Sequence, residues 1–318
     1  MKLTREKLLD MYRKMALSRA FEETAMRLFS LGKVHGTAHF CIGEEATGTG
    51  VCAGIEANDL IYATHRGHGQ SISKGMDINL MMAEFLGKAT GVCGGKGGCM
   101  HIADISAGNL GANGIVGGGI PIAVGAALST AMQKIDRVVV CFFGDGASNQ
   151  GTFHEAVNLA SIWKLPIVFA CVNNCYGMSM RVNASMNIED ISVRASSYGI
   201  PGRSVDGNDV MAVHDAAAEA REHARKNGPV LLVLNTYRIM GHSKSDSGAY
   251  RKKEEVEEWK KKDPIKRFAS YLADQKVFTA AELSAVDAEV QAAIERAVAF
   301  AESSPEPSLD AVEQDVYA

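Results

Sequence analysis

The chain has 318 residues, of which 47% are hydrophobic and 22% are charged, a composition typical of a globular protein with a large core. Its formal net charge of −4 argues against a nucleic acid as its main partner. No apolar run reaches the ~18 residues that a membrane span needs, and the first residues resemble neither a signal peptide nor a transit peptide. The seven cysteines are odd in number, which favours core thiols over disulfides. We therefore expect a bacterial cytoplasmic protein without a membrane segment.

Residues 4–31 form the first predicted element, a long helix with Thr4 as its N-cap and with apolar residues at helical spacing. We interpret it as a packing helix without chemistry. His39 follows, four residues before Gly43-Glu44-Glu45-Ala46. Histidine changes its protonation near neutral pH, which suits proton transfer at a substrate carbonyl. His35 and His39 could be metal ligands, but no third ligand lies near them in the sequence.

A strand is predicted at residues 60–63, and it runs directly into His65 and Arg66 between glycines. Polar groups at the carboxyl end of a strand suit an anion, and the arginine fork matches a phosphate oxygen pair. The earlier segment 48–53 fits the dinucleotide fingerprint by its letters, but it does not follow a strand. We interpret that segment as a close helix-packing site, which weakens the alternative of a nicotinamide-dependent oxidoreductase.

Residues 87–119 are dense in glycine, which predicts loops with close backbone approaches instead of a long helix or strand. The interspersed apolar residues indicate a packed region and not a disordered linker. No Gly-Lys-Ser/Thr sequence occurs, so a nucleotide P-loop is not expected. A helix rich in small residues is predicted at 120–133.

The stretch from Val138 to Tyr176 carries the strongest signal in the chain. Two apolar runs, 138–143 and 167–172, predict buried parallel strands, with a helix from about Ala147 to Trp163 between them. The first strand ends in Gly144-Asp145-Gly146 and the second ends in Asn173-Asn174, so both turns lie at the same edge of the sheet. A carboxylate, an amide oxygen and backbone carbonyls are hard ligands for Mg²⁺ or Ca²⁺. The helix start beside Asp145 would add N–H groups for a phosphate, so we predict a magnesium-bound diphosphate.

The remaining chain contributes one further polar strand end. A helix is predicted at 209–226 and a buried strand at 230–235, which leads into Gly241-His242-Ser243. The mixed-charge run 251–263 is read as a solvated helix, with a docking face as the alternative. A last helix is predicted from Thr279 to about Ala301.

The Gly-Asp-Gly and Asn-Asn turns, with Tyr176-Gly177-Met178 after them, resemble the thiamine-diphosphate motif. The wider sequence resembles the alpha subunit of the first component of 2-oxo acid and acetoin dehydrogenase complexes, from about Leu8 to about Pro307. The resemblance implies an α/β thiamine-diphosphate-binding fold with a central, mostly parallel sheet and helices on both faces. It implies a single domain over 1–318, with the N-terminal helix 4–31 and a C-terminal helical tail 252–318 as extensions.

The resemblance also implies roles for individual residues, which are written here as expectations. The catalytic residues would be His39 and His242, and the metal ligands would be Asp145, Asn174 and Tyr176. The cofactor would be bound by His65, Arg66, Gly114, Val116, Asp145, Gly146, Ala147, Asn174, Tyr176 and His242. Regulated members of the family are phosphorylated on serines in the loop that corresponds to the one bearing His242 here. Ser243 is a serine in that loop. One departure is Val172, because the family usually has an acidic residue immediately before Asn-Asn.

Thiamine chemistry also requires a carboxylate that hydrogen-bonds the aminopyrimidine ring, and the sequence offers no convincing candidate. Glu155 lies in the helix after the diphosphate motif, which is the wrong end of the cofactor. The resemblance implies that a separate beta subunit supplies this glutamate, in an assembly of two alpha and two beta chains. The small-molecule substrate would be acetoin or pyruvate, or else a branched-chain 2-oxo acid, and a lipoyl-bearing acyltransferase would take up the product. The segment 111–119 favours acetoin or pyruvate, with a weak preference for acetoin. A non-catalytic regulatory subunit remains the last alternative.

Overall fold

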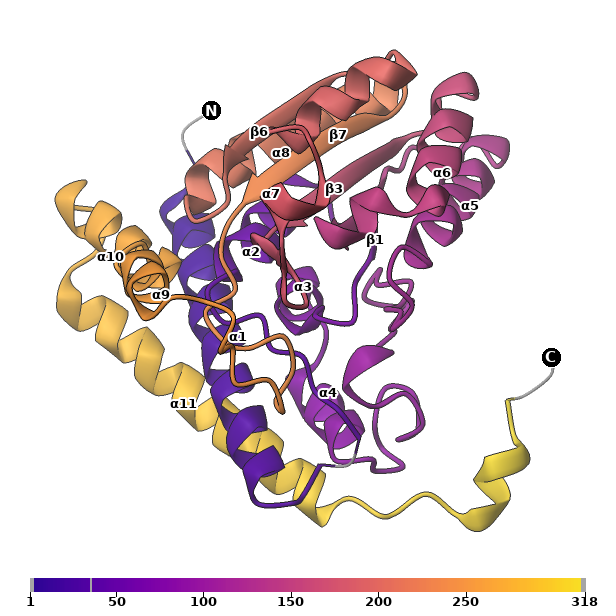
Figure 1. The fold of residues 1–318 in the computed structure, drawn as a ribbon. Helices are drawn as coiled ribbons and strands as arrows, with labels where there is room; N and C mark the ends of the chain where they lie inside the picture. Colours follow the sequence, from indigo (N-terminus) through magenta and orange to yellow (C-terminus); the bar gives the residue numbers. More distant parts are fainter. Residues whose placement is uncertain (1–2, 35, 316–318) are drawn as a thin grey trace.

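A computed structural model of the chain describes residues 3–34 and 36–315 (Figure 1). Within these residues, five parallel strands form one sheet in the order β1-β2-β3-β7-β6. Their bounds are β1 Leu60–Tyr62, β2 Val139–Gly144, β3 Ile167–Asn173, β6 Gly202–Asp206 and β7 Val230–Asn235. A parallel sheet covered by helices is the predicted α/β fold, which the structure confirms.

The central strands β2, β3 and β7 are apolar up to their last residue because both faces of the sheet are covered. In β2, Cys141 and Phe143 point to one face, where they pack with α5 (Gly119–Met132) and α6 (Gly151–Ile162). Val140 and Phe142 point to the other face, toward α2 (Glu45–Gly54) and α8 (Val210–Asn227). The alternation of a strand thus divides one apolar run between two cores.

Helices α1 (Arg5–Ser30) and α11 (Ala280–Ser303) lie side by side outside the sheet layers (Figure 1). The predicted caps are present, because the Thr4 hydroxyl accepts a hydrogen bond from Lys7 N, and Thr279 forms a capping box with Glu282. Helices α3 (His68–Lys74), α4 (Ile78–Phe85) and α10 (Pro264–Asp274) complete this outer layer. It supports the loops that bear His39 and Arg66 from behind.

The predicted close packing around residues 48–53 is present in α2. A side chain at Gly50 would meet Val213 at 2.6 Å, and one at Gly54 would meet His214 O at 2.6 Å. These glycines therefore let α2 and α8 approach each other closely.

The element after Asp145 differs from the prediction. We expected one helix from about Ala147 to Trp163, with its start beside Asp145. The structure instead has a single 3₁₀ turn, Gly146–Asn149, and α6 begins only at Gly151. Gln150 is extended, with φ −77° and ψ 145°, and this residue separates the two. The helix that begins beside Asp145 is therefore this short 3₁₀ helix and not α6, and its N–H groups are the ones available there.

Two further elements were not predicted in full. The edge strand β6 was not predicted because it is short and mostly polar. The charged run after residue 251 forms α9 (Lys253–Lys260), after which Asp263 caps α10. The other short elements are η1 Gly98–Met100, β4 Tyr176–Gly177, β5 Met180–Arg181, α7 Val182–Ser185, η3 Ile191–Tyr198 and η4 Leu309–Glu313. Among the described residues, no helix combines the length and the apolar character that crossing a bilayer requires.

The glycine-dense region forms irregular loops, as predicted. The buried carboxylate of Glu84 organises it by accepting four backbone hydrogen bonds. The donors are Cys93 N (2.8 Å), Gly95 N (2.9 Å), Gly97 N (2.7 Å) and Gly98 N (2.9 Å). A charged acceptor thus replaces regular secondary structure in satisfying these N–H groups.

Candidate active site

A cavity of about 350 Å³ opens at the carboxyl ends of β1, β2, β3 and β7. Most of the predicted site residues line it, although they come from distant parts of the sequence. These are His65, Arg66, Val116, Asp145, Gly146, Ala147, Asn174, Tyr176 and His242. The edge formed by the carboxyl ends of parallel strands is where α/β proteins bind their ligands, and here it gathers the motifs into one site.

The acidic turn and the amide turn meet because β2 and β3 are neighbours in register. Gly144 pairs with Val172, so Asp145 and Asn174 leave adjacent strands at the same level. Burial raises the pKa of Asp145 to about 6, although backbone hydrogen bonds and Arg238 act in the opposite direction. A buried carboxylate held in this way gains from a nearby cation.

Tyr176 contributes its main chain to this end of the cavity. Its hydroxyl points away, toward the Glu255 carboxylate at 3.1 and 3.2 Å. Its carbonyl oxygen accepts a hydrogen bond from Arg238 Nη1 at 3.1 Å, and a carbonyl has a second lone pair. The oxygen available to a cation at Tyr176 is therefore that of the backbone.

Two buried guanidinium groups give the cavity a positive wall. Arg66 donates from Nη1 to Phe40 O at 2.7 Å and from Nη2 to His242 O at 2.9 Å. Arg238 is 1% exposed and comes within 3.4 Å of His242 Nδ1. Because these two charges lie in a partly desolvated cavity, they favour an anion there.

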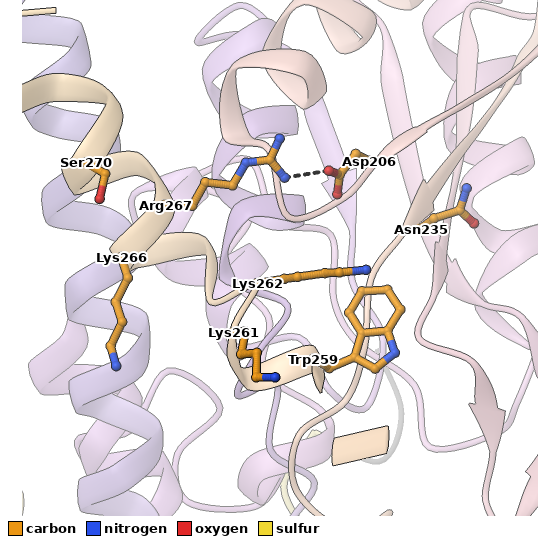
Figure 2. A pocket seen from close by; sticks show the side chains of 8 residues that line it. All are labelled: Asp206, Asn235, Trp259, Lys261, Lys262, Lys266, Arg267 and Ser270. Carbon is orange, nitrogen blue, oxygen red and sulfur yellow. Dashed lines mark hydrogen bonds and ion pairs between the residues drawn. The ribbon is translucent and has the colours of Figure 1, made fainter. Parts of the chain in front are cut away.

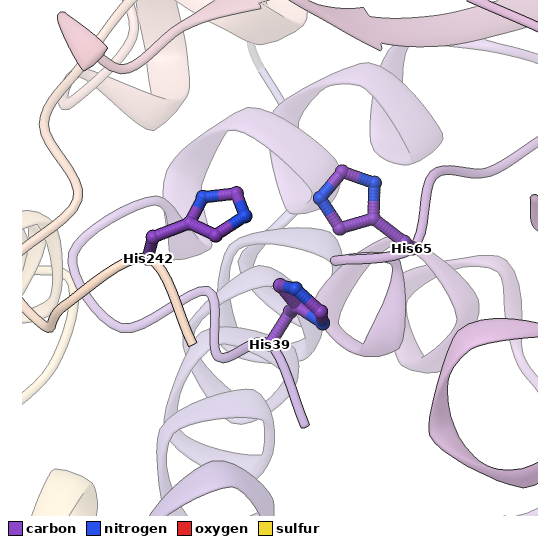
Figure 3. Close-up of side chains that lie close together, drawn as sticks. All are labelled: His39, His65 and His242. Atoms are coloured by element: carbon purple, nitrogen blue, oxygen red, sulfur yellow. The ribbon is translucent and has the colours of Figure 1, made fainter. Parts of the chain in front are cut away.

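Three histidines from separate loops lie close together (Figure 3). Arg66 and Arg238 both approach the ring of one of them, His242. The His39 ring centroid lies 4.8 Å from that of His65 and 5.0 Å from that of His242. Burial, followed by the charge of Arg66, lowers the pKa of His39 to about 4, that of His65 to about 3 and that of His242 to about 4. All three are therefore neutral near pH 7.

The trio supplies the further ligand groups that the sequence around His39 lacks, since one nitrogen of each ring lies within 4.8 Å of the others. A metal ion among them would nevertheless face Arg66 and Arg238 at close range. His39 Nδ1 is buried and has no hydrogen-bond partner among the described residues. The cluster is therefore better suited to hydrogen-bonding a polar or anionic ligand.

The opposite end of the cavity is the glycine-rich rim, which we define as residues 111–119. Asn113, Ile115 and Val116 line the cavity, whereas Gly114 stands behind them, where a side chain would meet the His101 ring at 3.5 Å. Ile115 is 72% exposed and Val116 is 48% exposed. The rim is thus apolar and open, in contrast to the charged and buried wall at the strand ends.

Sequence reasoning missed two charged residues of the site. Arg238 follows β7 as Arg66 follows β1, so the rule that identified one identifies the other. Glu44 precedes α2, lines the cavity and accepts a hydrogen bond from Asn174 Nδ2 at 2.9 Å. Burial raises the pKa of Glu44 to about 7, against the opposing charges of Arg66 and Arg238. The adjacent acids Glu44 and Glu45 were the available signal.

The carboxylates of the lining residues are those of Glu44 and Asp145. Both carboxylates lie beside Asn174, at the strand-end wall. Among the described lining residues, none of those at the rim has a carboxylate. Glu155 is exposed on α6 and is not a lining residue, in agreement with the expectation that it lies outside the reactive end. Val172 is buried in the sheet, so the carboxylate that reaches Asn174 comes from Glu44 instead of the position before Asn-Asn.

A second, more open hollow of about 730 Å³ lies beyond β6 and β7, against α9 and α10 (Figure 2). Its basic residues include Arg267, which is paired with Asp206 and Asp209, and Lys262, which lies over the Trp259 ring at 4.5 Å. None of the predicted site residues lines this hollow. The cavity at the strand ends is therefore the candidate active site.

Comparison with known proteins places this site in a family. Residues 13–310 match the dehydrogenase E1 component family. The chain is 49% identical over 317 residues to the alpha subunit of acetoin:2,6-dichlorophenolindophenol oxidoreductase of Bacillus subtilis, covering 99% of this chain and 95% of that protein. The corresponding subunit of Cupriavidus necator is 44% identical, with the same coverage. The alpha subunit of the pyruvate dehydrogenase E1 component of Porphyra purpurea is 38% identical, covering 99% of this chain and 94% of that protein. The chain belongs to the dehydrogenase E1 component family, as an alpha subunit of a thiamine-diphosphate-dependent oxidoreductase that works with a beta subunit.

Proposed function

We propose that this chain is the alpha subunit of an acetoin dehydrogenase, which binds thiamine diphosphate through Mg²⁺ and acts with a beta subunit. The observation that carries the proposal is the cavity in which a buried acid and amide pair faces two buried arginines. This arrangement suits a divalent cation bound to a diphosphate. The cation would meet the oxygens of the acid and the amide, and the diphosphate would meet the two arginines.

The residues at the strand ends fit the metal. The Asp145 carboxylate, the Asn174 side-chain oxygen and the Tyr176 carbonyl would hold Mg²⁺. These are hard oxygen donors, and the burial that raises the pKa of Asp145 to about 6 is relieved by a cation. A free carbonyl lone pair at Tyr176 supports the third ligand.

The positive wall fits the diphosphate. His65, Arg66 and His242 would bind its oxygens together with Arg238, which sequence reasoning did not identify. Neutral imidazoles donate hydrogen bonds without the cost of burying further charge. The N–H groups of Gly146 and Ala147, in the 3₁₀ turn after Asp145, lie in the same lining and add main-chain donors.

The rim fits the ring end of the cofactor and explains the need for a partner. Val116 would present backbone groups to the aminopyrimidine, whereas Gly114 stands behind the lining, and the described lining has no carboxylate there. The beta subunit would supply it and would cover the exposed side chains of Ile115 and Val116. Two alpha and two beta chains would form the assembly.

Thiamine diphosphate, when bound, supplies the electron sink for breaking a carbon–carbon bond next to a carbonyl. The chain's own residues bind and orient the reactants and exclude water. His39, neutral and with a free buried Nδ1, would hold or move a proton at the substrate oxygen. His242 belongs to the same cluster and would act next to the diphosphate.

The substrate assignment depends on the relatives. The acetoin-oxidising subunits are 49% and 44% identical to this chain, whereas the Porphyra pyruvate dehydrogenase subunit is 38% identical. Acetoin would lose acetaldehyde and pyruvate would lose carbon dioxide, and either would leave a two-carbon unit. A lipoyl group of a partner acyltransferase would then take up this unit.

The test is dye reduction by the chain co-expressed with its beta subunit, with thiamine diphosphate and Mg²⁺ present. Reduction of 2,6-dichlorophenolindophenol should be fastest with acetoin, slower with pyruvate and slowest with branched 2-oxo acids. A preference for pyruvate would retain the site and overturn the substrate. A folded complex that is inactive on all of them would favour a regulatory subunit.

A further inference from the structure

The adjacent acids Glu44 and Glu45 point to different parts of the molecule. Glu45 is bonded to Arg19 Nε at 2.5 Å and to Gly43 N at 3.1 Å, so it joins α1 to the start of α2. Glu44 is 5% exposed and turns into the cavity, where it accepts the hydrogen bond from Asn174. One acid therefore has a structural partner, while the other contacts a candidate metal ligand.

The main chain of Glu44 is fixed on both sides. Its N–H donates to Cys41 O at 2.9 Å, and its carbonyl accepts from Thr47 Oγ1 at 2.7 Å. Glu44 occupies the N-cap position of α2, yet its side chain makes no capping hydrogen bond. The carboxylate is thus used in the cavity and not in the helix cap that its position would allow.

An asparagine side chain has two ends of similar shape and opposite hydrogen-bonding character. At Asn174, Nδ2 faces the Glu44 carboxylate at 2.9 Å, and Oδ1 accepts from Tyr176 N at 3.3 Å. An ionised carboxylate only accepts hydrogen bonds, so the reversed amide would place two oxygens against each other. The pair therefore allows only the orientation in which Oδ1 faces the turn of Tyr176, where the cation would be bound.

We propose that Glu44 is a positioning residue that holds the Asn174 amide with its oxygen toward the cofactor's metal ion. This inference rests on the proposed role of Asn174 as a ligand. Without Glu44, the amide can turn, and its NH₂ group would then oppose a cation. Partners of this kind, which orient a ligand without touching the metal, typically change metal affinity by about 10–100-fold.

The experiment measures the Mg²⁺ concentration that gives half of the thermal stabilisation, at saturating thiamine diphosphate, for the alpha–beta complex. Glu44→Ala should raise this concentration by about tenfold or more. Glu44→Gln should change it by no more than about threefold, because a glutamine oxygen still accepts from Asn174. The exposed Glu155→Gln is the matched control and should have no effect.

A reversed pair separates orientation from charge or packing. Asn174→Asp alone places two carboxylates in contact and should weaken Mg²⁺ binding by about tenfold. In Glu44→Gln/Asn174→Asp, the glutamine NH₂ can donate to one aspartate oxygen and leave the other for the metal. The double variant should therefore bind Mg²⁺ more tightly than Asn174→Asp alone. Equal affinities in the two backgrounds would overturn the proposal.

Asp145→Ala distinguishes the failure of this inference from that of the metal site itself. If Asp145→Ala abolishes the Mg²⁺ response while Glu44→Ala leaves it unchanged, the positioning role is wrong and the metal site stands. If Asp145→Ala leaves the response intact, the proposed metal site is wrong, and the role of Glu44 is wrong with it.

Discussion

The two ends of the cavity differ in how completely this chain builds them. At the strand-end wall, Asp145, Asn174 and Arg238 are each 8% exposed or less, and Asn174 and Arg238 form hydrogen bonds with Glu44 and Tyr176. At the rim, Ile115 and Val116 are 72% and 48% exposed, and the described lining residues offer no carboxylate. One end is preorganised by the sheet, and the other is an open apolar surface.

The difference supports the proposal that a partner completes the site at the rim. Parallel strands fix the positions of their terminal residues through the hydrogen-bond register, which orders the wall. The rim is a glycine-rich loop that leads into α5 and belongs to no strand of the sheet. An exposed apolar surface next to a buried charged site is the expected form of an active site shared between subunits.

The largest effect is expected at the wall, from Asp145→Asn. The isosteric amide removes the metal-binding charge, so the response to thiamine diphosphate with Mg²⁺ should weaken by on the order of 100-fold or more. The folded pKa of Asp145, about 6, lies above its unfolded value of 3.8. The ionised group therefore costs stability above pH ~6, and this cost disappears as the pH falls toward 3.8.

Asp145→Asn should thus stabilise the unliganded chain at pH 8 by about 1–3 kcal/mol while it removes the metal response. Urea unfolding without ligands measures the first effect, and thermal shift with ligands measures the second. An unchanged metal response, or a large loss of unliganded stability, would contradict the account of the wall.

The next effect is expected where the glycine-rich region is anchored, from Glu84→Gln. The amide places an NH₂ group against backbone N–H donors that now share a carboxylate. We expect a loss of about 2–4 kcal/mol in the free energy of unfolding, because buried donors lose charged acceptors. Denaturant unfolding of the unliganded chain measures it, with the exposed Glu258→Gln as a control near zero. An unchanged free energy of unfolding would show that the loops do not depend on the Glu84 carboxylate.

A smaller effect tests whether the open rim continues into a subunit surface. Ile122, in the first turn of α5 next to the rim, is 49% exposed. Ile122→Glu should weaken association with the beta subunit by roughly 10–30-fold, since a charge would enter an apolar contact. The fold of the isolated chain should not change.

Titration of complex formation by size-exclusion chromatography measures that loss. Tyr271→Glu is the control, because Tyr271 is 41% exposed on α10, which lies on the opposite side of the molecule from α5 (Figure 1). If both variants associate normally, the rim does not extend into the interface along α5.

The smallest effect concerns the histidines between the two ends. The folded pKa of His39 is about 4, below its ordinary value of 6.5, because burial and Arg66 disfavour the cation. Below pH 6.5 the unfolded chain therefore binds a proton that the folded chain does not, and His39 destabilises the fold as the pH falls toward 4. His39→Gln should remove this contribution to the loss of folding stability at low pH.

The measurement is the difference in unfolding midpoint between wild type and His39→Gln at a series of pH values from 8 to 4.5. The unfolding midpoint of the variant should rise relative to that of wild type only below about pH 6.5. A difference that is constant with pH would mean that His39 acts through packing alone.

The strand ends were accessible to sequence reasoning and the orientations around them were not. The apolar runs that lead to Asp145, Asn174 or Arg66 can be recognised from the sequence, because buried strands and the turns after them have a local pattern. Glu44 has no such signature, since only its contact with Asn174, 130 positions away, distinguishes it from Glu45. The break at Gln150 was missed for a related reason, because helical spacing continues across it.

The sequence by itself determined the α/β class, the order of the main elements and nine of the residues that line the cavity. The class and the elements follow from apolar periodicity and from turns, which depend on neighbours along the chain, whereas several of the nine lining residues follow from the family resemblance. Only the tertiary structure decided that His39 meets His65 and His242, that Glu44 faces Asn174, and that the rim stays open. Such contacts join segments that the register of the sheet and the packing of α1, α2 and α11 bring together, and no local pattern encodes them.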